Sequence, residues 1–114
     1  MENCIFCKII KKEIPSAIVY EDDVVIGFKD INPVAPVHIL IVPKTHLSSV
    51  NEINEKNADI IAKIHLAAQK IAKEMNIHEK GYRLINNCGP DAGQTVFHLH
   101  YHLIGGKNLG SKIL

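Results

Sequence analysis

The stretch that decides the fold is 97–104, Phe97-His98-Leu99-His100-Tyr101-His102-Leu103-Ile104. Side chains alternate between the two faces of a strand, so the three histidines are predicted to share one face. Leu99, Tyr101 and Leu103 would then cover the opposite face. The outer two histidines would lie about 13 Å apart, too far for all three to bind one metal ion without a bend. This pattern is typical of a half-buried strand that presents imidazoles to a cleft.

The rest of the chain supplies the elements around this strand. Short β-branched runs predict strands at 17–21, 24–29, 38–42 and 82–86, with the histidine strand at 96–104. Apolar spacing predicts a short helix over 4–13 and a long one over 57–75, the latter capped by Asn54 or Asn57. We therefore expect an α+β fold, an antiparallel sheet with the helices packed on one face.

Length and composition restrict the class of protein. The chain has 114 residues, of which 46% are apolar, and a formal net charge of +1. We expect a single domain over 1–114, and no electrostatic footprint for duplex nucleic acid or a membrane surface. The longest apolar stretch, 39–42, is far short of a membrane span, and no secretory signal is visible at the N-terminus. These features predict a cytoplasmic protein.

Two uses of the histidine strand are open from its spacing. A neutral imidazole is a nucleophile near neutral pH when its second nitrogen donates to a fixed acceptor. The loop just upstream, 89–95, can supply backbone N–H groups and a hydroxyl for a phosphate. Alternate histidines on a strand also bind metals, and the bare spacing does not decide between catalysis and metal binding.

Longer motifs indicate a family. Residues 98–104 (HLHYHLI) resemble the His-φ-His-φ-His-φ-φ signature of the histidine triad (HIT) superfamily, most closely its nucleotide-binding branch. Segments 28–33 (FKDINP), 36–46 (PVHILIVPKTH) and 93–96 (GQTV) resemble that branch in the same order. The resemblance spans about residues 4–106. It implies a five-stranded antiparallel sheet with one long and one short helix, and a sheet that extends across a homodimer.

The resemblance also implies a reaction, hydrolysis by two-step displacement at phosphorus. His100 is the implied nucleophile, which attacks the α-phosphorus of a nucleotide while its ring is held by the carbonyl of His98. His102 is implied to bond the phosphate or the leaving group. His38 is implied to lie behind the nucleophile, and a satisfied core histidine is the alternative. No metal is needed for the chemical step.

A nucleotide site follows from the same resemblance. Asp30 matches the ribose-binding acid, although an Asx turn before Asn32 explains it as well. Asn87 matches an asparagine near the phosphate, and 93–95 match the phosphate-binding loop through Gly93, Gln94 and Thr95. The implied lining of the purine pocket is Phe6, Ile9, Phe28 and Ile31, apolar residues that core packing explains equally well.

A zinc site is a separate prediction. Cys4-x-x-Cys7 offers half of a four-ligand site, and three cysteines are an odd number for a disulfide framework. By resemblance to some bacterial members of the superfamily, His46 and His98 complete it around a structural zinc ion. The alternative is that both cysteines are buried apolar residues on one face of the short helix.

The leading functional hypothesis is a hydrolase that binds purine nucleotides and releases AMP or GMP from nucleoside phosphoramidates. Dinucleoside polyphosphate hydrolysis is one alternative, and a zinc-stabilised nucleotide-binding or interaction module with little turnover is another. The tail, 107–114, is short and lacks tryptophan. In related proteins this tail reaches across the homodimer.

Overall fold

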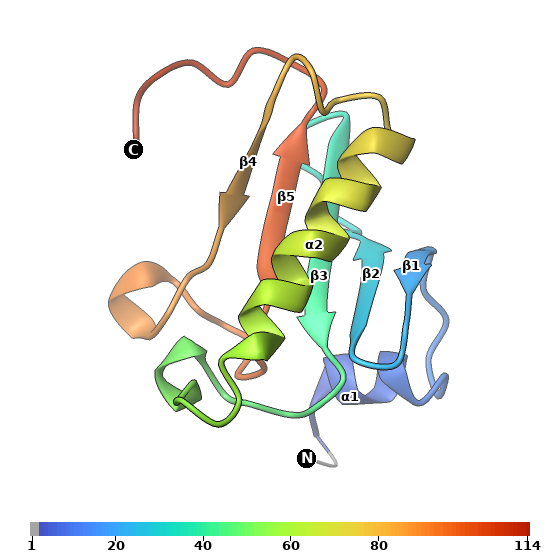
Figure 1. Cartoon of the computed structure of the whole chain (residues 1–114), viewed down its shortest axis with the longest axis vertical. Coiled ribbons are helices and arrows are strands. Elements are labelled where there is room, and N and C mark those ends of the chain that lie inside the picture. The colour runs from blue at the N-terminus through green and yellow to red at the C-terminus, as the bar shows by residue number, and fades with distance from the viewer. Residues whose placement is uncertain (1–2) are drawn as a thin grey trace.

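The computed structural model describes residues 3–114. Its centre is a five-stranded antiparallel sheet in the order β1-β2-β3-β5-β4 (Figure 1). The strands are β1 Ile18–Glu21, β2 Val25–Lys29, β3 Val37–Pro43, β4 Tyr82–Ile85 and β5 Tyr101–Gly105. The helices are α1 Ile5–Ile10 and α2 Asp59–Glu74, with short 3₁₀ turns at Val50–Glu52 and Pro90–Ala92. The predicted α+β architecture is confirmed.

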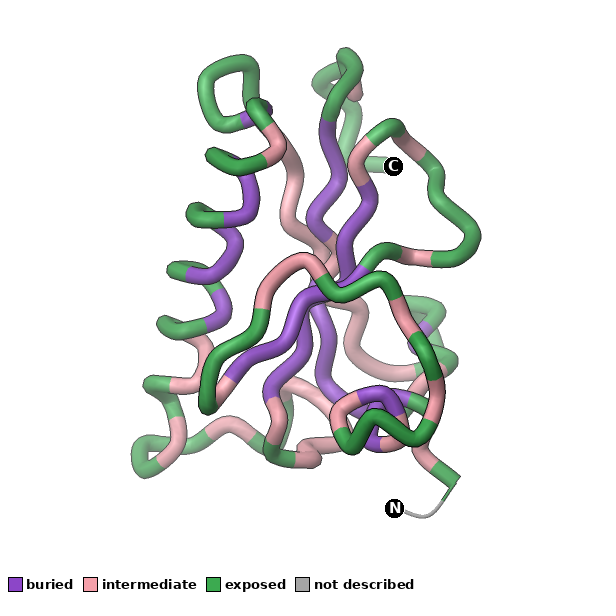
Figure 2. Tube along the Cα trace, turned by 90° about the vertical axis from the view of Figure 1, so that its right-hand side faces the viewer, coloured by how far each residue is buried: buried purple, intermediate pink, exposed green. Residues whose placement is uncertain are grey.

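The two helices lie on opposite faces of the sheet, so the expectation that both pack on one face is wrong. Alternate residues of β3 belong to different clusters, Ile39 and Ile41 with α2, Leu40 and Val42 with α1. The inner strands β2, β3 and β5 are therefore mostly buried on both sides, as the purple along them in Figure 2 shows. An unbroken apolar run such as 39–42 indicates burial on two faces because a half-buried strand would alternate.

The alternation predicted for the histidine segment holds. Leu99, Tyr101 and Leu103 belong to the cluster that packs against α2. His102 pairs with Leu40 of β3 and so shares the α1 face with it. The apolar ladder thus fixes the segment to the core while the imidazoles face the other way.

The last strand starts five residues later than predicted, at Tyr101 in place of position 96. The β3–β5 register pairs Val37 with Gly105 and Ile41 with Tyr101, so Leu99 would face Pro43. Proline has no N–H to donate, which prevents the ladder from continuing. The N–H of Leu99 donates to the carbonyl of Leu47 at 2.6 Å, and the chain at 96–100 is free to turn.

Helix α2 begins after the predicted asparagine caps. Its N-cap is Ala58, which makes no side-chain capping bond. Asn54 Oδ1 accepts from the N–H groups of Lys56 and Asn57, one turn earlier, so the predicted cap position is wrong. None of the helices in residues 3–114 is both long and apolar enough to span a membrane.

Candidate active site and metal-binding cluster

His100, the residue just before β5, is held by the backbone of His98. Its Nδ1 lies 2.7 Å from the carbonyl oxygen of His98, so Nδ1 carries the proton and donates it. His100 Nε2 has no hydrogen-bond partner within residues 3–114. Every fully buried side-chain nitrogen or oxygen of that range does have a partner, so Nε2 is not fully buried. The Nε2 atom therefore reaches solvent although the residue as a whole is only 8% exposed. The ring presents an unprotonated nitrogen outward, the arrangement that a nucleophilic imidazole needs.

The Phe6 ring of α1 supports this imidazole from the side. The two ring centroids lie 5.1 Å apart with the planes at 82°, an edge-on contact. Phe6 meets His98 and Phe28 in the same way. Such packing restricts the rotation of His100 without using either of its nitrogens.

His102, His38 and Asp30 form a chain beside His100. His38 Nε2 lies 2.9 Å from His102 Nδ1 and 3.4 Å from Asp30 Oδ2. His38 contacts His102 directly, and burial lowers the pKa of His102. Asp30 Oδ1 accepts from the N–H of Asn32 at 2.8 Å, so the Asx turn is present as well. One carboxylate oxygen of Asp30 therefore accepts a hydrogen bond within its own turn, and the other faces His38.

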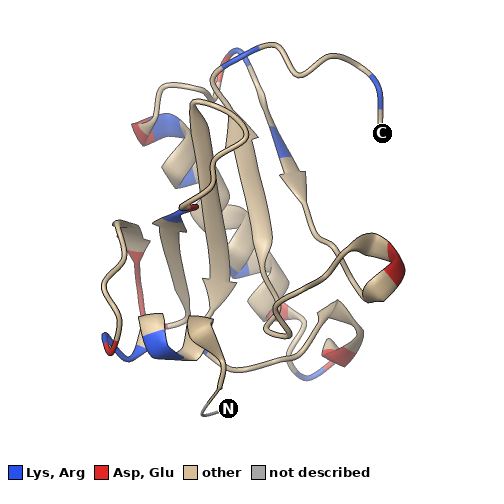
Figure 3. Cartoon of the chain, turned by 180° about the vertical axis from the view of Figure 1, so that it is seen from behind, with Lys and Arg blue, Asp and Glu red and all other residues tan. Residues whose placement is uncertain are grey.

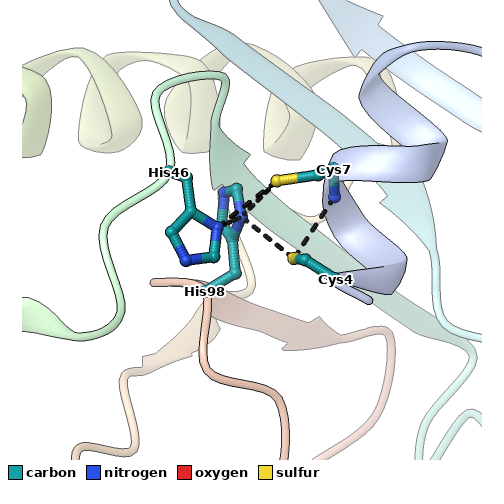
Figure 4. Close-up of side chains that lie close together, drawn as sticks. All are labelled: Cys4, Cys7, His46 and His98. Atoms are coloured by element: carbon teal, nitrogen blue, oxygen red, sulfur yellow. Dashed lines mark hydrogen bonds between the residues drawn. The ribbon is translucent and has the colours of Figure 1, made fainter. Parts of the chain in front are cut away.

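Cys4, Cys7, His46 and His98 come together from three separate segments, and their ligand atoms lie within 4.8 Å of one another. Figure 4 shows Cys4, the N-cap of α1, and Cys7 within α1 turned toward the two imidazoles, one from the loop after β3 and one from the segment before β5. His98 Nδ1 lies 3.5 Å from Cys4 Sγ and 3.6 Å from Cys7 Sγ. His46 Nδ1 lies 3.3 Å from Cys7 Sγ and 3.1 Å from His98 Nδ1.

These distances fit the tetrahedral coordination of a metal ion. Zinc bonds of about 2.3 Å to sulfur and about 2.1 Å to nitrogen separate S and N ligands by about 3.6 Å, and two N ligands by about 3.4 Å. The second nitrogen of His98 completes the argument, because Nε2 donates to the carbonyl of Pro43 at 2.8 Å. That bond leaves Nδ1 unprotonated and directed at the cluster, and burial lowers the pKa of the ring. The four residues can hold a metal ion.

The residues implied to line a purine pocket separate into two groups. Phe6, Ile9 and Phe28 are buried in the core cluster on the α1 face. Ile31 is 90% exposed, on the loop after β2. The first three therefore already contribute to the core in the free chain, whereas Ile31 is open to a ligand.

The loop before the histidines is held by Gln94. Its Nε2 donates to the carbonyls of Ser48 and Val96, and its Oε1 accepts from the N–H of Gly89. This side chain is engaged inside the protein, unlike the exposed Thr95 and the half-buried Asn87. Gly93 adopts a left-handed conformation with φ +78°, which favours glycine.

Comparison with known proteins identifies relatives of this chain. The HIT domain family model matches residues 11–109. The chain belongs to the histidine triad family. It is 48% identical over 109 residues to the purine nucleoside phosphoramidase of Escherichia coli, covering 96% of this chain and 92% of that protein. A HIT family hydrolase from Clostridium thermocellum superposes with a TM-score of 0.98 at 66% identity, covering 100% and 99% of the two chains. A histidine triad protein from Clostridium difficile gives 0.95 at 54% identity, covering 98% and 97%.

Sequence reasoning missed two positions of this histidine triad site. Asn86 Nδ2 donates to the carbonyl of His100 at 3.0 Å, and Pro43 supplies the carbonyl that orients His98. In the sequence, the only feature that indicates a role for Asn86 is its position next to Asn87. Pro43 acts through its backbone carbonyl, and its residue type does not indicate that role.

Charge is distributed around the rim of the histidine triad sheet. Strands β3 and β5 contain no Lys, Arg, Asp or Glu, and Figure 3 shows the charged residues mainly in the surrounding helices and loops. The strands that carry His38 and His102 therefore add no fixed charge of their own beside these imidazoles.

Proposed function

We propose that this histidine triad protein is a hydrolase that binds purine nucleotides and releases AMP or GMP from P–N conjugates through a nucleotidyl-histidine intermediate. The observation that carries this proposal is the state of His100, with Nδ1–H bonded to the carbonyl of His98 and Nε2 accessible. The phosphoramidase of Escherichia coli, 48% identical over 109 residues, supports the substrate class.

The first step exchanges one bond to phosphorus for another. The lone pair of His100 Nε2 forms a bond to the α-phosphorus, and the P–N bond to the amine breaks with its electron pair on the amine. The amine leaves in its protonated form because a proton from solvent has reached its nitrogen. His102 bonds the phosphate oxygens or the leaving group, where charge develops.

The second step releases the nucleotide. A water molecule attacks phosphorus, the bond to His100 Nε2 breaks, and the electron pair returns to the ring. The proton that water loses passes to solvent, and AMP or GMP departs. No step requires a metal ion.

The nucleotide is expected to lie over the α1 face of the sheet. Asp30 is proposed to accept from the ribose hydroxyls, and Asn87 with the loop Gly93–Thr95 to contact the phosphate. Ile31 is exposed and is proposed to contact the base. Because Gln94 is bonded internally, its proposed contribution is to hold the loop.

We also propose that Cys4, Cys7, His46 and His98 bind one structural zinc ion. When bound, zinc would supply four strong bonds between α1, the loop after β3 and the segment before β5, and no chemistry in the reaction. The fit of the ligand distances supports this proposal.

A homodimer is proposed as the assembly. Strand β4 is an edge strand of the sheet, and Leu66 of α2 is 53% exposed, so an edge and an apolar position are available to a second copy. Light scattering should give twice the chain mass of 12.7 kDa, about 25 kDa. A mass near 12.7 kDa at micromolar concentration would refute it.

Trapping the intermediate tests the proposed function. The protein is mixed with an adenosine phosphoramidate that carries a fluorescent amine, denatured within milliseconds at alkaline pH, and weighed by intact mass spectrometry. We expect one added adenylyl group on the wild type and none on His100→Ala, with amine release falling about 10⁴-fold or more in the variant. Undiminished turnover in His100→Ala would disprove the covalent route. AMP binding by the wild type without amine release would indicate a binding module in place of an enzyme.

A further inference from the structure

Cys4 and Cys7 lie on one helical turn with their sulfurs close together. Cys4 precedes α1 directly, and its Sγ accepts from the N–H of Cys7 at 3.4 Å. The N–H of Lys8 donates to the carbonyl of Cys4 at 3.1 Å, which closes the turn. The two sulfurs lie within 4.8 Å of each other, and neither belongs to a disulfide. A small closure of the turn would bring them to the bonding distance of about 2.05 Å.

The two thiols differ in exposure. Cys7 is buried, with 8% of its surface exposed, whereas Cys4 is only half-buried. A small oxidant reaches the more accessible sulfur first, so we expect Cys4 to react with it and Cys7 to resolve the product. An accessible thiol beside a second cysteine is typical of a peroxide-sensitive pair. The third cysteine, Cys88, lies outside the cluster.

We propose that Cys4 and Cys7 are a modification site, at which a hydroperoxide forms a disulfide and thereby releases the proposed zinc ion. The thiolate of Cys4 attacks the peroxide, the O–O bond breaks, and Cys4 becomes a sulfenic acid. The hydroxide or alkoxide that leaves takes a proton from solvent. The thiolate of Cys7 then bonds to Cys4 Sγ, and the sulfenic oxygen leaves as hydroxide, which is protonated in turn. The two sulfurs give up two electrons, and the peroxide takes both.

The disulfide removes half of the proposed ligand set. Zinc binds the thiolate form of cysteine, and a sulfur in a disulfide carries no such charge. His46 and His98 would remain as the only ligands. Because structural zinc sites have four protein ligands, we do not expect two imidazoles to retain the ion. The cluster is therefore expected to have two states, a reduced state with metal and an oxidised state without it.

His98 connects this cluster to the nucleophile. Its Nδ1 lies 3.5 Å from Cys4 Sγ and 3.6 Å from Cys7 Sγ. Its carbonyl accepts from His100 Nδ1 at 2.7 Å. One residue thus contacts the thiols through its ring and orients the nucleophile through its backbone. When the two sulfurs bond to each other, the ring of His98 is expected to lose its partners at Nδ1 and to keep only the carbonyl of Pro43 at Nε2.

Phe6 gives a second connection. It lies between the two cysteines in sequence, and its ring meets those of His98 and His100 edge-on, at centroid distances of 6.0 Å and 5.1 Å. Helix α1 has six residues, too few to be stable without tertiary contacts. A change in its first turn is therefore expected to move Phe6 against the ring of the nucleophile.

Activity is expected to follow the state of the cluster, high when the thiols are reduced and low when they are oxidised. This effect rests on the proposed hydrolase function, and the release of metal rests on the proposed zinc site. Formation of the disulfide depends on neither.

Mass spectrometry and zinc release test the modification on the full chain. The Cys88→Ser protein, which retains only the two cluster thiols, is loaded with zinc, freed of reductant and treated with hydrogen peroxide at neutral pH. We expect a mass loss of two hydrogen atoms, a Cys4–Cys7 bond in the peptide map, and release of one zinc per chain to a colorimetric chelator at the same rate. Absence of the disulfide, or a disulfide with the zinc retained, would overturn the proposal. A disulfide in a protein that takes up no zinc would refute the zinc site and leave the thiol chemistry standing.

Trapping tests the order of the two steps. Dimedone, which reacts with sulfenic acids, is added together with the peroxide, and its adduct on the Cys88→Ser protein should map to Cys4. In Cys7→Ser the sulfenic acid has no resolving thiol, so labelling of Cys4 should be complete. In Cys4→Ser, labelling of the buried Cys7 should be about tenfold slower. Equal labelling of the two thiols would contradict the assigned order, and the Cys88→Ser result decides the matter where a variant does not fold.

Turnover of the fluorescent phosphoramidate tests the connection to His100. We expect peroxide to lower amine release about tenfold or more, because small displacements of a reacting group are costly, and reductant with zinc to restore it. The double variant Cys4→Ser, Cys7→Ser controls for damage elsewhere, and the same peroxide should leave its residual turnover unchanged. NMR signals of the His100 ring should shift on oxidation, a readout that needs no turnover.

The two proposals fail in different ways. Full turnover and unshifted His100 signals in the oxidised protein would refute the connection between the cluster and the nucleophile. A reduced, zinc-loaded protein that releases no amine would refute the proposed hydrolase function and leave the disulfide result standing.

Discussion

His100 is positioned by hydrogen bonds to two backbone carbonyl groups of the segment just before β5. Its ring donates to the carbonyl of His98, and its own carbonyl accepts from Asn86 at 3.0 Å. The first bond sets which nitrogen is exposed, and the second fixes the peptide from which the ring projects. A small rotation of that peptide would move Nε2, so we expect Asn86 to affect the proposed reaction without touching substrate.

Replacing Asn86 with alanine tests this role. We expect Asn86→Ala to lower kcat about tenfold, equivalent to the loss of about one net hydrogen bond, with KM little changed. The proposed phosphate contact Asn87 provides the contrast, because Asn87→Ala should act on KM as well. Steady-state kinetics with the fluorescent phosphoramidate separates the two. An unchanged kcat in a folded Asn86→Ala protein would show that the strand alone positions His100.

Strand β2 and helix α2 approach each other closely at Gly27. A Cβ atom placed on this glycine would lie 3.0 Å from Ile71 Cδ1, and 3.5 Å from the Cβ of Tyr20. Ile71 is fully buried, so it has little room to move away. The glycine is needed because of the close approach of helix and strand.

A double-mutant cycle measures this contact. Gly27→Ala should lower the free energy of unfolding by about 1–3 kcal/mol, and Ile71→Val by about 0.5–1.5 kcal/mol. Because Ile71→Val removes Cδ1, the double variant should be more stable than the sum of the two losses predicts. Urea unfolding of the four proteins gives the coupling. Additive losses would show that the Gly27–Ile71 contact does not decide the cost.

The Cys/His cluster connects parts of the molecule that are far apart in sequence. Cys4 and Cys7 belong to the α1 region, His46 to the loop after β3, and His98 to the segment before β5. Phe6, between the two cysteines, contacts the His100 ring. A zinc ion there would hold the N-terminal region against the active strand.

Removal of the ligands tests zinc at the scale of the whole protein. Elemental analysis should find one zinc per chain in the wild type and in Cys88→Ser, whose thiol lies outside the cluster. The double variant Cys4→Ser, Cys7→Ser should lose the metal, and its Tm should fall by about 10 °C or more. Zinc retained by the double variant, or a metal-free wild type with the same Tm, would refute the structural site.

The element pattern was predictable because it depends on local periodicity. The strands at 18–21, 25–29 and 37–43, helix α2 and the alternation of Leu99, Tyr101 and Leu103 all follow from apolar spacing. The start of β5 was not predictable in this way. It depends on the register that places Leu99 opposite Pro43, and register is a property of the assembled sheet.

The residue types of the site and the family could be predicted from the sequence. Imidazoles at alternate positions and paired cysteines indicate their chemistry without any coordinates. Only the tertiary structure decided which groups each histidine contacts. His38 and His102 are 64 residues apart, and His46 and His98 are 52 apart. Which nitrogen of His98 carries the proton depends on the backbone group behind the ring, the carbonyl of Pro43. Folding brings that group into contact, so the amino-acid order alone cannot assign the proton.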